Sequence, residues 1–263
     1  MIDLHSHILP GVDDGSQSFD ESVEMLKASV ADGVKAIVAT PHIFSQLSKV
    51  TEIEKFRYIF SEFKAKAYKL SLGIEIIQGS ENYFATDLKE KLNEFRDILT
   101  INNSDYFLLE FPMNFIFPGT KAFIYEVLNE GYIPVICHPE RNTDIQANPS
   151  ILYEFLTAGA LSQLDAGSIR GDFGSNSRNA ANILLKNNLV HVIASDCHDM
   201  KSRKPGLALI KQLLTWIDPE KSNLFLDIIP TAIINNEGIP DIGPLKDPAV
   251  RRKPFFNRFG RKK

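Results

Sequence analysis

The chain has 263 residues, 44% hydrophobic and 24% charged, which is typical of a folded globular protein and suits one large α/β domain. Its formal net charge is −4, and residues 249–263 contribute seven positive charges and no negative one, which leaves −11 on residues 1–248. An acidic body favours cation binding and argues against a broad nucleic-acid-binding surface; we expect no nucleic-acid partner.

Short β-branched runs alternate with longer amphipathic segments along the chain. Ser18 and Glu21 form a capping box at the first helix, and Gly33 follows that helix. In chain order, the predicted elements are a strand at 2–4, a helix at 18–32, a strand at 36–39, a helix at 51–70, a strand at 74–78, a helix at 87–95, a strand at 106–109, a helix at 121–129, a strand at 133–136, a helix at 149–157, a strand at 161–164, a helix at 178–186, a strand at 190–194, and closing helices at 205–216 and 222–235.

Seven strand-then-helix units in series predict a parallel sheet, which at this number of strands closes or nearly closes into a barrel. We expect one domain over residues 1–245. A Pro/Gly-rich segment at 238–248 leads out of it into a flexible basic C-terminal tail, residues 246–263.

The two cysteines, Cys137 and Cys197, do not make a disulfide framework, and they predict a reduced, cytoplasmic protein. No run reaches the roughly 18 apolar residues of a membrane span. The first strand begins at the first residues and leaves no room for a secretory leader.

Histidines and carboxylates cluster at the ends of the predicted strands. Five of the six histidines directly follow a strand, and four carboxylates occupy the same kind of position. They are His5, His7, Asp14, His42, Glu81, Glu110, His138, Asp196 and His198. The carboxyl ends of the strands of a βα barrel meet on one face, so we expect these side chains to converge there. His191 is predicted to lie inside the last strand and to be structural.

A convergent set of imidazoles and carboxylates predicts a metal site, because clustered carboxylates repel and are costly to desolvate without cations. Mixed histidine and carboxylate ligands suit Zn, Mn, Fe or Co better than Mg or Ca. In His5-Ser6-His7, the alternation of side chains along a strand places both histidine rings on one side, where together they can bind one metal ion.

These motifs resemble those of the polymerase and histidinol phosphatase (PHP) superfamily. Residues 1–16, with the His138-Pro-Glu-Arg141 and Ser195-Asp-Cys-His198 motifs, resemble in particular the bacterial manganese-dependent protein tyrosine phosphatases of the CpsB/YwqE type. The resemblance covers about residues 1–240. It implies a distorted (β/α)7 barrel, similar to a TIM barrel, with three divalent ions, Mn²⁺ for preference, at the carboxyl ends of the strands. The implied ligands are the nine residues named above.

The resemblance further implies that a metal-activated hydroxide hydrolyses phosphotyrosine in a protein, in opposition to a bacterial tyrosine kinase of capsule or exopolysaccharide synthesis. Arg141 and Arg203 stand where the family holds the phosphate, and surface salt bridges are the alternative role for them. Four loop phenylalanines are candidates either to stack on a tyrosine ring or to anchor their loops: Phe44, Phe111, Phe115 and Phe117. Asp165 lies at the end of a strand. It is a candidate for an additional acidic residue near the metal site, with capping of the following loop as the alternative role.

Several other functions remain open from the sequence. Cys197 and Arg203 have the C-x5-R spacing of cysteine-dependent phosphatases, but no glycine lies between them to wrap a phosphate. The superfamily includes histidinol-phosphate-like small-molecule phosphatases and exonucleases. An amidohydrolase also begins with an HxH motif, although no strand-end lysine is evident here. A metal-bound, non-catalytic partner of a kinase is a further alternative.

The basic tail interleaves Phe255, Phe256 and Phe259 with its arginines and lysines. It is a candidate to contact an acidic partner or membrane surface, with a solvated disordered end as the alternative.

Overall fold

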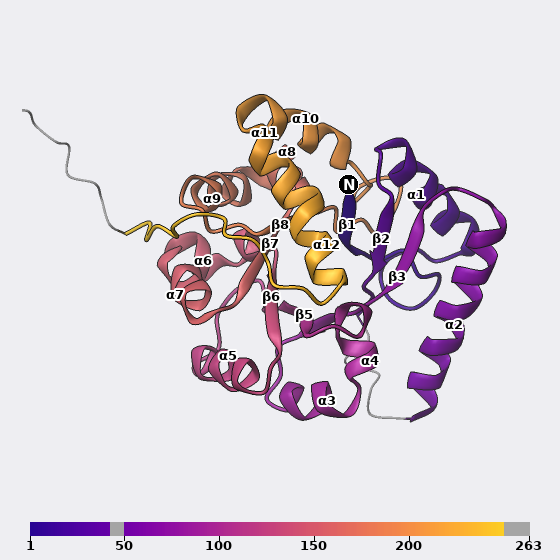
Figure 1. Ribbon diagram of the computed structural model, residues 1–263, viewed down its shortest axis with the longest axis horizontal. Coiled ribbons are helices and arrows are strands. Elements are labelled where there is room, and N and C mark those ends of the chain that lie inside the picture. Colours follow the sequence, from indigo (N-terminus) through magenta and orange to yellow (C-terminus); the bar gives the residue numbers. More distant parts are fainter. Residues whose placement is uncertain (43–49, 250–263) are drawn as a thin grey trace, which may run out of the picture.

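The computed structural model describes residues 1–42 and 50–249 and shows a mixed α/β fold with parallel sheets. Figure 1 shows the strands at the centre and most of the helices around them. The strands are β1 (Ile2–Ser6), β2 (Ala36–Ala39), β3 (Glu75–Gln78), β4 (Glu81–Tyr83), β5 (Tyr106–Glu110), β6 (Ile133–Cys137), β7 (Leu161–Asp165) and β8 (Val192–Ala194).

Two sheets contain these strands, one of order β1-β2-β3 and one of order β4-β5-β6-β7-β8, and every pairing is parallel. The register pairs Ile37 with Ile76 and Leu108 with Val135, so apolar residues of neighbouring strands lie side by side. All residues of β2 and β5 are buried, as expected for parallel strands that are covered on both faces.

Two isolated bridges join the two sheets. Ser6, the last residue of β1, bridges to Cys197 just beyond β8, and His42, just beyond β2, bridges to Glu81, the first residue of β4. The Glu81 amide also donates to the Pro41 carbonyl at 3.2 Å. Ser6, Cys197 and His42 lie at or just after the carboxyl ends of their strands, and Glu81 lies just after β3, so these ends of the two sheets come together.

Helices connect successive strands and cover the sheets. They are α1 (Phe19–Ala31), α2 (Val50–Lys69), α3 (Leu88–Glu94), α4 (Arg96–Leu99), α5 (Thr120–Asn129), α6 (Thr143–Ala147), α7 (Ser150–Ala158), α8 (Ala166–Arg170), α9 (Gly174–Lys186), α10 (Leu207–Ile217), α11 (Pro219–Asn223) and α12 (Ile229–Ile234), with short turns η2 (Ile101–Asn103) and η3 (Pro139–Arg141) and a π-helical turn η4 (Leu224–Ile228). The Ser18 hydroxyl caps α1 by accepting from the Glu21 amide, as the capping box predicts.

The segment after α12 covers the amino end of β5. The Tyr106 hydroxyl, at the start of β5, donates to the Glu237 carbonyl at 2.7 Å. The Asp105 amide donates to the Asn236 side chain at 2.8 Å. With this end covered, the opposite end of the strands is left for a functional site.

The observed elements differ from the predicted ones in several places, and the short helices α4, α6 and α8 were not predicted. β4 was not predicted, because it has only three residues and follows β3 after two. His191 precedes β8 and does not lie inside it, but it is buried. The helix predicted at 222–235 divides into α11, η4 and α12; Pro230 lacks the amide hydrogen that a regular helix needs there.

Among residues 1–42 and 50–249, no helix is long and apolar enough to cross a bilayer. The segment leading to the tail contacts the body, where the Lys246 amide donates to the Asn187 carbonyl at 3.0 Å. Phe44 and the tail beyond Ala249, with its three phenylalanines, lie outside the described residues.

Candidate metal centre

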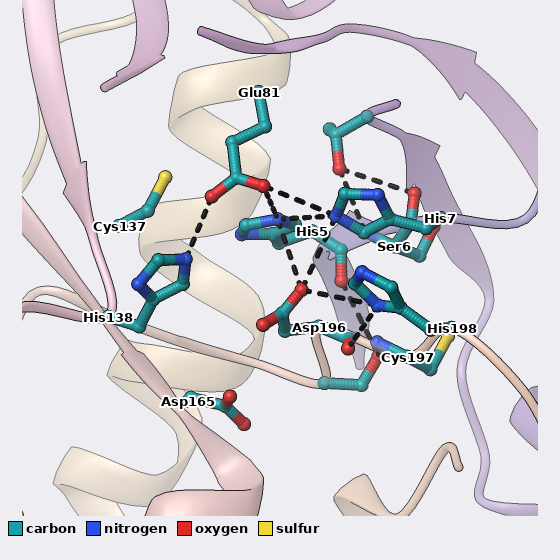
Figure 2. Close-up of polar contacts among 12 residues, drawn as sticks. His5, Ser6, His7, Glu81, Cys137, His138, Asp165, Asp196, Cys197 and His198 are labelled. Carbon is teal, nitrogen blue, oxygen red and sulfur yellow. Dashed lines mark hydrogen bonds and ion pairs between the residues drawn. The ribbon is translucent and has the colours of Figure 1, made fainter. Parts of the chain in front are cut away.

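All nine side chains predicted to bind metal meet at the carboxyl ends of the strands. His5 and His7 come from β1 and its end, Glu81 from β4, and Asp196 from the segment after β8. Figure 2 shows their rings and carboxylates pointing toward one another. Residues far apart in the sequence are therefore neighbours, as the strand-end pattern predicts.

The centre of the cluster is the pair His5 and His7. Their Nε2 atoms are 3.1 Å apart, and both face the same two carboxylates. Glu81 Oε2 lies 3.1 and 3.3 Å from these nitrogens, and Asp196 Oδ1 lies 3.3 and 3.4 Å from them. All four residues are buried.

Unpaired polar atoms indicate that this cluster fits a cation. Asp196 Oδ1 and His198 Nε2 are buried and have no hydrogen-bond partner. Orphaned buried acceptors are costly, and a divalent ion would satisfy both atoms. Nitrogen and carboxylate oxygen together suit transition metals and zinc.

The donor atoms fall into three overlapping groups, each with atoms within 4.8 Å of one another. The groups are His5, His7, Glu81 and Asp196; His7, Asp14, His42 and His198; and His42, Glu81 and Glu110. His138 adjoins them, with its Nε2 2.8 Å from Glu81 Oε1 and 3.9 Å from Glu110 Oε1.

Two residues that were not predicted orient the central histidines. Asp13 Oδ2 lies 2.7 Å from His7 Nδ1, and Gln163 Oε1 lies 2.8 Å from His5 Nδ1. An acceptor at Nδ1 holds the proton on that atom and turns a free Nε2 lone pair toward the cluster, an arrangement common behind metal-binding histidines. Asp13 directly precedes the predicted Asp14, which was the one available signal. Gln163 lies within β7 and carries no sequence signal of its own.

The site is open on one side. The side chains of His42 and Asp14 are 36% and 64% exposed, whereas those of His5, Glu81 and Asp196 are buried. A ligand therefore reaches the cluster past His42 and Asp14.

The crowding of charged groups shifts their proton affinities in opposite directions. Burial alone would lower the pKa of His5, but the carboxylates of Glu81 and Asp196 raise it to about 9. Burial and the Glu81 charge raise the pKa of Glu110 to about 8. Burial and the nearby His7 lower the pKa of His198 to about 3. When no cation is bound, groups with a raised pKa, such as His5 and Glu110, keep their protons, and metal binding would displace these protons.

Two residues of the cluster have a strained backbone. His138 and Asp196 have φ values of 32° and 51°, in the left-handed region. Elsewhere in residues 1–42 and 50–249, non-glycine residues with positive φ are serine or asparagine only. Such strain costs on the order of 1–3 kcal/mol per residue and concentrates at functional sites.

The two predicted phosphate-binding arginines lie at the edge of the cluster. Arg141 Nη1 donates to Asp196 Oδ2 at 2.9 Å, and Arg203 Nη2 donates to the same oxygen. The Arg141 guanidinium also lies 4.3 Å from the centre of the Phe173 ring. Arg203 Nε is buried without a partner. Asp165 caps α8 through Gly167 and lies 3.5 Å from Arg141, so both roles expected for it are present.

The predicted aromatic candidates do not all face solvent. Phe111 is buried, and Phe117 stacks on Phe84 at 5.2 Å, so both anchor their loop. Phe115 is 44% exposed and contacts the edge of Phe117 at 4.6 Å.

Cys197 is buried, and burial together with Asp3 raises the pKa of its thiol well above the ordinary value. A nucleophilic cysteine needs the opposite shift, so the C-x5-R spacing is not evidence of a thiolate mechanism.

The fold and the site define a parallel α/β protein with a candidate metal centre at its strand ends. The chain belongs to the CpsB/CapC family of capsular polysaccharide synthesis, whose family model matches residues 1–221. CapC of Staphylococcus aureus is 40% identical over 213 residues, which cover 81% of this chain and 82% of that protein. The tyrosine-protein phosphatase YwqE of Bacillus subtilis is 36% identical over 203 residues, covering 77% and 79%.

Two solved structures have a similar fold. One comes from work on YwqE of Bacillus subtilis and CpsB of Streptococcus pneumoniae, which are described as metal-dependent tyrosine phosphatases. It superimposes with a TM-score of 0.86 at 31% sequence identity, and the match covers 96% of this chain and 100% of that chain. A phosphotriesterase homology protein from Escherichia coli has a TM-score of 0.57 at 12% identity, covering 89% and 98%, which shows a shared fold alone.

Proposed function

We propose that this protein is a metal-dependent protein-tyrosine phosphatase that acts in the cytoplasm on a bacterial tyrosine kinase, or its phosphorylated partner, in capsule synthesis. The observation that carries this proposal is the convergence of His5 and His7 on Glu81 and Asp196, with nitrogen and oxygen donors 3.1–3.4 Å apart. Membership of the CpsB/CapC family and the likeness to metal-dependent tyrosine phosphatases support the substrate class.

We further propose that the nine converging residues hold three divalent ions, with Mn²⁺ as the preferred ion. The three overlapping donor groups support this number. We also propose that residues 1–245 form one domain, a distorted (β/α)7 barrel. The bridges between the two sheets support it, and β3 and β4, only two residues apart, act as one interrupted strand.

Bound divalent ions would supply positive charge that offsets the charge of a phosphate and favours deprotonation of water. The chain's own residues do the rest. Asp13 and Gln163 hold the His7 and His5 rings in place. Arg141 and Arg203 orient Asp196 through Oδ2, and their remaining exposed N–H groups would bind non-bridging phosphate oxygens.

The test is phosphate release from a phosphotyrosine peptide, with a phosphoserine peptide and histidinol phosphate in parallel, in Mn²⁺ or in EDTA. We expect turnover of phosphotyrosine that requires metal, is lost in Glu81→Gln and survives in Cys197→Ser. Preferential turnover of histidinol phosphate would contradict the proposed substrate but would still support the proposed metal site. Metal binding without turnover of any ester would overturn the enzymatic proposal.

A further inference from the structure

The strand that carries Glu81 also carries an aromatic residue, Tyr83, two positions farther along. Side chains alternate along a strand, so Tyr83 lies on the same face of β4 as Glu81. Two residues advance a strand by roughly 7 Å, which places Tyr83 nearer the mouth of the site than Glu81. The intervening Asn82 points the other way and is buried.

The neighbouring strand gives the same position independently. Tyr83 is in register with Glu110 of β5, and residues in register on parallel strands point to the same side. The Glu110 carboxylate reaches toward the cluster, with Oε2 3.7 Å from His42 Nδ1 and Oε1 3.9 Å from His138 Nε2. Tyr83 therefore stands beside a residue whose side chain is already in the site.

Tyr83 is also available to a ligand. It is 42% exposed, although its neighbours Glu81, Asn82 and Phe84 are buried. His42, in contact with Glu81 and Glu110, is on the open side of the site. An exposed aromatic ring beside buried charged groups is suited to bind an apolar group attached to an anion.

We propose that Tyr83 is a specificity-determining residue that packs against the aromatic ring of the phosphotyrosine substrate, an inference that rests on the proposed function. In phosphotyrosine the ring is joined to phosphorus through a single oxygen, so a phosphate in the cluster holds its ring close to the rim. An alkyl phosphate such as phosphoserine has no ring to contact Tyr83. The residue thus favours aryl over alkyl phosphates without contacting the reacting atoms.

The first experiment compares Tyr83→Ala, Tyr83→Phe and Tyr68→Ala in the full chain with Mn²⁺. Tyr68 is a matched control, because it is 86% exposed and lies near the end of α2, close to the amino end of β3. We expect Tyr83→Ala to lower kcat/KM for a phosphotyrosine peptide about five- to tenfold, mainly through KM, which is the size of an aromatic contact. Tyr83→Phe keeps the ring and should stay within about twofold of the wild type, as should Tyr68→Ala.

The second experiment needs no turnover. Calorimetric titration with benzylphosphonate and ethylphosphonate compares one anionic group with and without a ring. We expect Tyr83→Ala to weaken binding of benzylphosphonate alone. Equal weakening of both ligands, or of neither, would overturn the inference. Ring-selective weakening in a protein that hydrolyses no ester would uphold it and overturn the proposed function instead.

Discussion

Asp13 determines how the His7 ring is presented to the candidate metal centre. Its Oδ2 accepts from the His42 amide at 2.9 Å as well as lying 2.7 Å from His7 Nδ1. We expect Asp13→Asn, which keeps the shape and removes the charge, to weaken Mn²⁺ binding about 10- to 100-fold by calorimetry. Asp20→Asn removes the same charge from an exposed position on α1 and serves as the control. Equal affinities in the two variants would contradict this role.

His191 predicts how stability changes with pH. Burial lowers its pKa to about 4, and its Nδ1 accepts from the Ser162 amide at 3.2 Å. The unfolded histidine has the higher pKa, so stability is full above about pH 6.5 and is lost as the pH falls toward 4. Between pH 7.5 and 5, the free energy of unfolding should fall about 2 kcal/mol more for the wild type than for His191→Asn.

Urea unfolding of both proteins in EDTA measures this difference. Parallel pH profiles would show that His191 is not the group responsible.

At the level of single residues, the sequence predicts the candidate ligands but not the groups that orient them. Histidines and carboxylates at strand ends are visible because five of the six histidines share one local context. Gln163 acts on His5 across 158 positions of sequence, and nothing near it in the chain indicates that contact. The strain at His138 and Asp196 likewise becomes evident only from the backbone angles.

At the level of elements, β4 depends on one buried amide. Asn82 Nδ2 donates to the carbonyls of Leu99 and Leu108, both at 2.9 Å. Asn82→Ala would leave these buried carbonyls without that donor, so we expect a loss of about 2 kcal/mol in the free energy of unfolding by urea. Asn179→Ala, at an exposed position on α9, should change it by less than about 0.5 kcal/mol. Similar losses in both variants would contradict a special role for Asn82.

The same strand shows where element prediction fails. The long helices and the β-branched strands follow from periodicity, and their predicted bounds lie close to the observed ones. β4 reads Glu-Asn-Tyr, with no apolar alternation, and it exists because its backbone pairs with β5 and its asparagine is satisfied by two distant carbonyls. The element that carries Glu81 and Tyr83 is therefore set by tertiary contacts.

At the level of the whole molecule, the candidate ligands tie both sheets together, so metal binding should stabilise the entire fold. Each bound Mn²⁺ at 100 times its Kd is expected to add about 2.7 kcal/mol to the free energy of unfolding, seen as a rise in Tm that EDTA reverses. Glu81→Gln should abolish most of this rise. Glu75→Gln, exposed at the amino end of β3, should retain it. An equal rise in both variants would place the ion elsewhere.

The junction between β1 and β8 also has a consequence for synthesis of the protein. A ribosome makes His5 and His7 before Asp196 and His198, and 189 positions separate His7 from Asp196. At a translation rate of roughly 5–20 residues per second, the interval between synthesis of the two histidines and synthesis of Asp196 and His198 is on the order of ten seconds or more. A nascent or stalled chain therefore holds only part of the cluster, and the complete site forms only after the segment following β8 has been translated.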